Sequence, residues 1–265
     1  MFKKCLRQKI IAELIKSREL SISQLSEKVS ANRVSISKEL TVLKDSKIAT
    51  KKAGSTLYTL SSDIAFVIFK FYQESAQLLI YSPDGSLYER EEVETVHSLS
   101  YEDNVIFLSK RIEKRAEFLK KRFERVVICI IHDKKMDISQ PIYKMFEFTS
   151  LRATLTARHI EYESKDEAVL YVNSLYPISF ICKDGEAVTP NAYPNDKVLQ
   201  SAKTALNLIK PNRVLLEGKE SDSLSLACLR NDIPLLFINS NGGLSTDERG
   251  MIEEALYKLS TTNIS

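Results

Sequence analysis

Polar and basic side chains lie along a helix that the sequence predicts for residues 33–46. Ile36, Leu40 and Leu43 recur at spacings of four and three, so they share one face of an α-helix and are expected to be buried. The opposite face carries hydroxyl, guanidinium and ammonium groups, which can donate hydrogen bonds to an anionic or polar partner. The stretch Ser21–Leu60 is therefore the first candidate for chemistry.

The net charge of +3 conceals an uneven distribution along the chain. Residues 1–61 hold thirteen Lys and Arg against five Asp and Glu, an excess of eight positive charges, and the remaining residues hold twenty-five against thirty. Such an excess predicts a polyanionic partner for the first part of the chain. Charge alone does not separate DNA from RNA or from an anionic lipid surface.

Residues that could hold a metal or perform catalysis do not cluster. The four cysteines lie more than forty residues apart without a CxxC or Cys/His pattern, so we expect reduced, buried thiols and no zinc. The histidines have no partner at the spacing of a metal site or a triad, which favours structural or solvent-exposed roles. These residues are Cys5, Cys129, Cys182, Cys228, His97, His132 and His159.

Composition and hydropathy indicate a soluble protein. With 265 residues, 43% hydrophobic and 28% charged, the chain is long enough for two domains with a sizeable core. The longest apolar runs, 64–69 and 126–131, are far shorter than the roughly 18 residues of a membrane helix. Residues 1–14 favour an amphipathic helix over a signal peptide, because Glu13 and several basic residues interrupt the apolar positions. We expect a cytoplasmic protein.

The elements that position the polar helix follow from the pattern of residues 1–61. A helix is predicted near Lys3–Ser17, and Ser21 begins a second helix through a capping box with Gln24. A turn at 30–32 leads to the helix at 33–46, and strands at 48–52 and 56–60 follow around Gly54. Three helices and a hairpin in this order are the arrangement of a winged helix-turn-helix domain, which we expect over 1–61.

The segment Val29–Ile48 resembles the recognition segment of bacterial winged-helix repressors, although Ser46-Lys47 stands where such proteins often have a glycine. The resemblance implies that the start of the helix enters the major groove, where Arg33 would pair with a guanine edge and Asn32 would read adenine or contact a phosphate. The wing lysines would hold phosphate or reach the minor groove. The implied DNA-binding residues are Asn32, Arg33, Ser35, Ser37, Lys38, Lys51 and Lys52. The alternative is a set of solvated polar positions on a small domain used for protein contacts.

The rest of the chain repeats one pattern. The first copy has strands at 64–71, 76–81 and 87–96, a helix at 101–123 and a strand at 126–131. The second has strands at 168–173, 178–183 and 186–189, a helix at 196–209 and a strand at 213–216, then helices at 221–230 and 246–259 around a strand at 235–238. This repetition is the plan of the α/β duplicated ribonuclease H-like fold of sugar kinases and actin, with halves of about 62–165 and 166–265.

A winged helix joined to such a body resembles the ROK family, whose members are repressors or sugar kinases. The resemblance implies an Asp-x-Gly-Gly-Thr phosphate loop at Lys70–Glu74 and a second loop at Ser174–Ile178, but neither segment contains the glycines that let backbone N–H groups approach phosphate. The segment that should hold the family's catalytic aspartate is shortened around 157–167. The role of this aspartate therefore cannot be assigned to Glu161, Glu163 or Asp166. The family's zinc cysteines and sugar-holding Glu-His pair have no counterpart in Thr189–Asn195.

The sequence therefore predicts a DNA-binding transcriptional regulator, a repressor by resemblance, with a degenerate, non-catalytic body and no cofactor or metal. Its partners would be double-stranded DNA and a second copy of the chain, because a lone winged helix offers few contacts. The body would be a small-ligand sensor or a dimerisation module. The alternatives are a sugar kinase with an unusual site and a protein-interaction module without DNA contact.

Two further stretches have a second interpretation. The charged run 110–125 keeps apolar residues at helical spacing, which favours a solvated face of a packed helix over a second nucleic-acid patch. Asn241-Gly242-Gly243 resembles a phosphate-binding turn before a helix, although a plain loop is the commoner meaning of such a pair.

Overall fold

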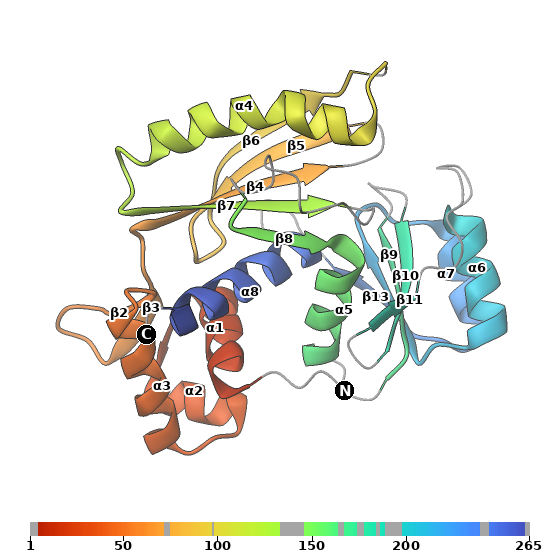
Figure 1. Ribbon diagram of the computed structural model, residues 1–265. Coiled ribbons are helices and arrows are strands. Elements are labelled where there is room, and N and C mark those ends of the chain that lie inside the picture. The colour runs from red at the N-terminus through yellow and green to blue at the C-terminus, as the bar shows by residue number, and fades with distance from the viewer. Residues whose placement is uncertain are drawn as a thin grey trace. The chain divides into compact units, whose positions relative to one another are not determined.

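Residues 5–61 form three helices and a small antiparallel sheet in the computed structural model (Figure 1). The helices are α1 (Leu6–Ser17), α2 (Ile22–Val29) and α3 (Arg33–Asp45). The strands β2 (Ala49–Lys51) and β3 (Leu57–Leu60) form the predicted hairpin. A third strand, β1 (Glu19–Ser21), pairs with β3 and was not predicted, because three residues between two helices are too few to show a period of two. We call residues 5–61 the N-terminal segment.

The structure describes residues 5–71, 75–96, 98–132, 146–163, 167–173, 178–183, 186–188, 198–238 and 244–262. These residues fall into two compact units. One unit holds the described residues of Arg152–Asp247, and the other holds the rest, including the N-terminal segment and the C-terminal helix from Glu248 onward. The division at 61/62 and near 165/166 stays a prediction.

The larger unit contains a five-stranded mixed sheet in the order β6-β5-β4-β7-β8. Its strands are β4 (Ile64–Phe71), β5 (Ser75–Tyr81), β6 (Leu87–Glu94), β7 (Arg125–His132) and β8 (Phe148–Leu151). β4 pairs antiparallel with β5 and parallel with β7, and all eight of its residues are buried, which explains its uninterrupted apolar run.

Helix α4 (Tyr101–Leu119) covers one face of this sheet. Its buried residues Val105, Leu108, Ile112 and Ala116 pack against one alternate set of the strand side chains, which includes Val67. The other set of β4 side chains, Phe66, Ile68 and Lys70, is also buried. Lys70 meets helix α8 (Thr246–Thr262), so this second face is covered as well.

The smaller unit repeats the same strand order, β11-β10-β9-β12-β13. Its elements are α5 (Arg152–Glu163), β9 (Val169–Asn173), β10 (Ile178–Lys183), β11 (Glu186–Val188), α6 (Val198–Ile209), β12 (Arg213–Glu217), α7 (Asp222–Arg230) and β13 (Leu235–Ile238). α6 and α7 pack on one face of the sheet and α5 packs on the other. The two sheets share their order and their antiparallel-then-parallel pairing, which confirms the predicted duplication.

Two elements of the body, by which we mean residues 62–265, were not predicted from the sequence. β8 has four half-buried residues, and α5 buries Arg152, Thr156 and His159 alongside apolar residues. Polar residues on the inner face of α5 hide the apolar period on which helix prediction depends. The helix expected to reach residue 123 ends at Leu119, and hydrogen-bonded turns follow it.

The cysteine prediction is confirmed except at one position. All four thiols are free, and Cys129, Cys182 and Cys228 are buried, whereas Cys5 is exposed. Burial raises the pKa of Cys182 to about 12, so its reactive thiolate is suppressed at neutral pH. Within the described residues, no helix has the length and apolar character needed to cross a membrane.

Candidate nucleic-acid interface

The start of α3 is fixed by its N-cap. Asn32 has an extended backbone, and its side-chain oxygen accepts a hydrogen bond of 2.8 Å from the backbone N–H of Ser35. This bond positions the first turn of α3 and engages the oxygen that Asn32 would use against an adenine edge. The side-chain NH2 of Asn32 is left for an outside partner.

The predicted DNA-binding residues of α3 differ in exposure. Arg33, Ser37 and Lys38 are exposed and Ser35 is half-buried, while the opposite stripe (Ile36, Leu40, Leu43) is at most 1% exposed. Neither Arg33 nor Lys38 forms an ion pair with another described residue. The charges of Arg33 and Lys38, near the start of α3, therefore face solvent with no ion-pair partner among the described residues.

Val34 belongs to the same exposed surface, and the sequence analysis did not select it. Its side chain is 67% exposed, and among residues 5–61 it is the one large apolar side chain that the structure leaves in solvent to this extent. A β-branched residue gains nothing from such a position in a helix. It presents methyl groups beside Arg33 and Lys38, where a thymine methyl could be contacted. The sequence did contain one sign of this exposure, because Val34 lies outside the buried stripe of Ile36, Leu40 and Leu43.

The β2–β3 loop carries the other predicted contacts. Gly54 adopts φ 69° in the turn. A Cβ atom at this position would have no neighbour within 4 Å, so glycine is favoured there by its backbone conformation and not by lack of space. Lys51 is exposed and without an ion pair in the described chain. Lys52 forms an exposed pair with Glu19 (Nζ to Oε2, 3.0 Å), so part of its charge is neutralised.

The residue after α3 is a lysine in a glycine-like conformation. Lys47 adopts φ 57°, in the left-handed region, which is a conformation that glycine adopts more readily. Its side chain forms an ion pair with Glu124, and the hydrogen bond that the ammonium donates to this carboxylate raises the pKa of Lys47. The departure from the family pattern at Lys47 thus coincides with a contact to the loop before β7.

α3 is held from behind by one arginine. Nε of Arg7 on α1 lies 2.7 Å from a carboxylate oxygen of Glu39 on α3. NH1 of Arg7 also donates to the carbonyl and hydroxyl oxygens of Ser260 on α8, at 3.3 Å each. One guanidinium therefore joins the first, third and last helices of the larger unit.

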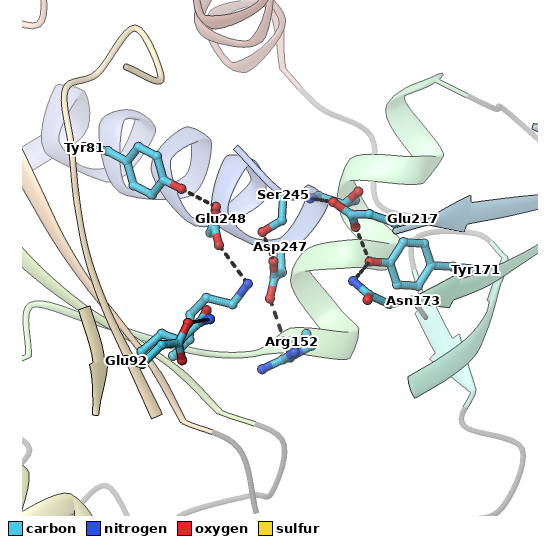
Figure 2. A network of polar contacts seen from close by, with 12 residues as sticks. Tyr81, Glu92, Arg152, Tyr171, Asn173, Glu217, Ser245, Asp247 and Glu248 are labelled. Carbon is cyan, nitrogen blue, oxygen red and sulfur yellow. Dashed lines mark hydrogen bonds and ion pairs between the residues drawn. The ribbon is translucent and has the colours of Figure 1, made fainter. Parts of the chain in front are cut away.

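In the larger unit, the position expected for the first phosphate loop holds an ion pair. Nζ of Lys70 lies 2.8 Å from Oε1 of Glu248, whose other oxygen accepts a 2.7 Å hydrogen bond from the hydroxyl of Tyr81 (Figure 2). The side chains of Lys70 and Glu248 are only 2% and 3% exposed. Burial first, and then Glu248, raises the pKa of the Tyr81 phenol, which keeps it a donor at neutral pH.

In the smaller unit, buried polar side chains also contact one another (Figure 2). Glu217 accepts hydrogen bonds from the Tyr171 hydroxyl and, at 3.3 Å, from the backbone N–H of Thr246. Asn173 donates to the same hydroxyl at 3.1 Å, and Arg152 lies 3.5 Å from Asp247. These carboxylates are held by donors, as structural groups are. No group of three or more possible metal ligands occurs in the described part of the chain.

Several predicted positions fall outside the described residues. They are Tyr72–Glu74 of the first loop, 174–177 of the second, Asp184-Gly185, Thr189–Asn195, Asn241–Gly243, Asp166 and His97. His132 and His159 are buried, in agreement with structural roles.

Comparison with known proteins defines the class of fold. No family model and no curated protein sequence matches the chain. A crystal structure of a ROK family transcriptional regulator, described as a homologue of the E. coli MLC protein, superposes over 96% of this chain and 96% of its own, with a TM-score of 0.63 and 12% identity. The predicted resemblance to the ROK family is therefore confirmed at the level of the fold.

Two further structures match a smaller share of the chain. A protein of actin-like ATPase fold and unknown function from Bacteroides thetaiotaomicron is 13% identical, with a TM-score of 0.46 over 72% of this chain and 96% of its own. A ROK family protein from Streptococcus pneumoniae, solved with sucrose, is 8% identical, with a TM-score of 0.41 over 73% and 98%.

Proposed function

We propose that this chain is a cytoplasmic DNA-binding transcriptional regulator in which the N-terminal segment is a winged helix-turn-helix and the ROK-like body is non-catalytic. The observation that carries the proposal is the exposed start of α3, where Arg33 and Lys38 have no ion-pair partner among the described residues and lie opposite a fully buried stripe. A helix anchored on one side and cationic on the other fits the major groove.

Within this proposal each exposed group has a role. Arg33 reads a guanine edge, Lys38 and Lys51 neutralise phosphates, and Ser37 donates to phosphate or base oxygens. Lys52 contributes less than Lys51, because Glu19 already pairs with it. A homodimer would place two such helices on a palindromic site, and the body would supply dimerisation or respond to a small ligand.

The second candidate, a sugar kinase, is supported by the actin-like fold itself. The Lys70–Glu248 pair argues against it, since a buried ammonium occupies the position aligned with the first aspartate of the family's phosphate loop and its charge is already compensated. ATP-dependent phosphorylation of a sugar by the purified chain would overturn the non-catalytic assignment.

The test is selection of bound fragments from a random duplex pool, followed by affinity measurements on the selected site. Arg33→Ala should cost about 1 to 3 kcal/mol on that site and relax preference at one base pair. Lys44→Gln is the matched control, because Lys44 is an exposed cation on the same helix roughly 16 Å further along its axis. Arg33 would be refuted as a base reader if the selection enriched no sequence. It would also be refuted if Arg33→Ala and Lys44→Gln changed the base-pair preference equally.

A further inference from the structure

The turn after α4 carries three consecutive basic residues, Lys120, Lys121 and Arg122, which we call the 120–122 turn. All three side chains are exposed. Backbone hydrogen bonds define the turn: the N–H groups of Lys120 and Arg122 donate to Ala116 and Leu119 at 2.9 and 2.8 Å. The charges therefore project from an ordered backbone.

None of the three charges has a carboxylate partner in the described chain. The nearest acidic residue that follows, Glu124, pairs instead with Lys47. The guanidinium of Arg122 lies 5.7 Å from the ring centre of Tyr88 and 5.5 Å from that of Phe123, so cation–π contacts hold it without removing its charge. Earlier along α4 the arrangement differs, because Arg111 and Arg115 pair with Glu91 and Glu89.

The residues that follow the 120–122 turn contact the N-terminal segment at Lys47 and the start of the next strand at Asp63. Glu124 forms its ion pair with Lys47, the residue after the C-cap of α3. The backbone N–H of Arg125 donates to the carbonyl of Asp63, two residues beyond Ser61, at 3.1 Å. In Figure 1 the α4–β7 turn and the end of α3 belong to the same unit, and the ion pair of Glu124 with Lys47 joins them.

We propose that the 120–122 turn is a second phosphate-binding surface, which contacts duplex DNA flanking the base pairs read by α3. The inference rests on the proposed function of the N-terminal segment. Three unpaired cations, one held by aromatic rings, match a polyanion, and the contacts at Lys47 and Asp63 make the surface continuous with the winged helix. For residues 120–122 the proposal favours the alternative that the sequence interpretation of 110–125 had placed second; the α4 portion is the solvated face expected there.

A simpler role is stabilisation of the α4 C-terminus, where cations interact favourably with the helix dipole. The two roles predict different results. Dipole stabilisation changes unfolding and leaves DNA affinity independent of duplex length, whereas phosphate contact makes affinity depend on flanking DNA and on salt.

The experiment compares the selected site as a minimal duplex with the same site extended by scrambled flanks, using the full chain at 50 to 200 mM KCl. The wild-type chain should bind the extended duplex more tightly and with a steeper salt dependence. Lys120→Gln/Lys121→Gln should remove most of the flank gain without changing affinity for the minimal duplex. Adding Arg122→Gln should remove the rest; three phosphate contacts correspond to a roughly 40-fold loss of affinity across this salt range.

Lys110→Gln/Lys114→Gln is the matched control, since both lysines are exposed on the same helix and also lack a partner in the described chain. Hydroxyl-radical footprinting of the wild-type chain adds a readout that no variant can disturb, and protection should extend into the flanks. If the chain binds its site specifically but the flanks are unprotected, or both double variants lose the flank gain equally, the inference is wrong and the proposed function stands. If no duplex is bound specifically, both fail.

Discussion

The buried pair between Lys70 and Glu248 makes a strong prediction about stability. Glu248→Gln keeps the size and hydrogen-bonding capacity of the side chain but removes the charge that compensates the Lys70 ammonium, 2.8 Å away and 2% exposed. Breaking a buried pair by removing one partner costs about 3 to 5 kcal/mol, because the remaining charge cannot regain its hydration. We expect this loss for Glu248→Gln and a similar loss for Lys70→Met.

The double variant Lys70→Met/Glu248→Leu should be far less destabilised than the sum of the single variants. Both charges are then absent, and the remaining cost is about 1 to 3 kcal/mol for the Tyr81 hydroxyl, which loses its acceptor. Adding Tyr81→Phe should recover part of that cost. The difference between the double variant and the sum of the singles measures the coupling of the pair.

The assay is urea unfolding followed by far-UV circular dichroism and tyrosine fluorescence, since the chain has eleven tyrosines and no tryptophan. Both probes must give one coincident transition before free energies are compared, because a chain of two units can unfold in steps. Single-variant costs below about 1 kcal/mol, or strictly additive effects, would show that Lys70 and Glu248 are not the tightly coupled buried pair described above.

Three further outcomes are expected. Lys47→Gly should leave the midpoint of urea unfolding nearly unchanged, because relief of the left-handed conformation offsets the lost exposed ion pair; a clearly lowered midpoint would contradict this balance. A thiol reagent at pH 8 should label Cys5 alone until the chain is unfolded, as mass spectrometry would detect, and labelling of two or more native thiols would refute the burial of the others. Burial alone would raise the pKa of Asp84, but hydrogen bonds from Ser82 and Ser86 outweigh it and lower the pKa below 3.8. The charged form of Asp84 therefore stabilises the fold above that pH. The free energy of unfolding of the wild-type chain should exceed that of Asp84→Asn by at most about 1 kcal/mol, and this difference should vanish as the pH falls through the lowered pKa of Asp84.

The sequence was sufficient where a local pattern determines the structure. β4 was predicted to the residue because seven of its eight positions are apolar, and α2 was located by the Ser21–Gln24 capping box, which the structure contains. The duplication was predicted from the repeated succession of three strands, a helix and a strand along the chain, although this pattern did not reveal β8. Each of these signals lies within a few residues of the structure it specifies.

Contacts between distant residues could not be predicted. Lys70 and Glu248 are 178 positions apart, and neither residue carries a local sign that it would be buried in a pair. The exposure of Val34 and the approach of Glu124 to Lys47 depend on how packed elements meet, which periodicity does not specify. Among the candidate DNA contacts, the sequence identified the helix and the loop, and the structure distinguished Lys51 from the paired Lys52.

The contact of Arg7 with both Glu39 and Ser260 has a consequence for the synthesis of the chain. The N-terminal segment leaves the ribosome first, and its own helices and hairpin can form from local contacts. The support behind α3 is complete only when α8 has emerged, more than 200 residues after Glu39. Until α8 has emerged, or in a chain truncated before it, the N-terminal segment would be folded while α3 lacks the contact that Arg7 makes with Ser260.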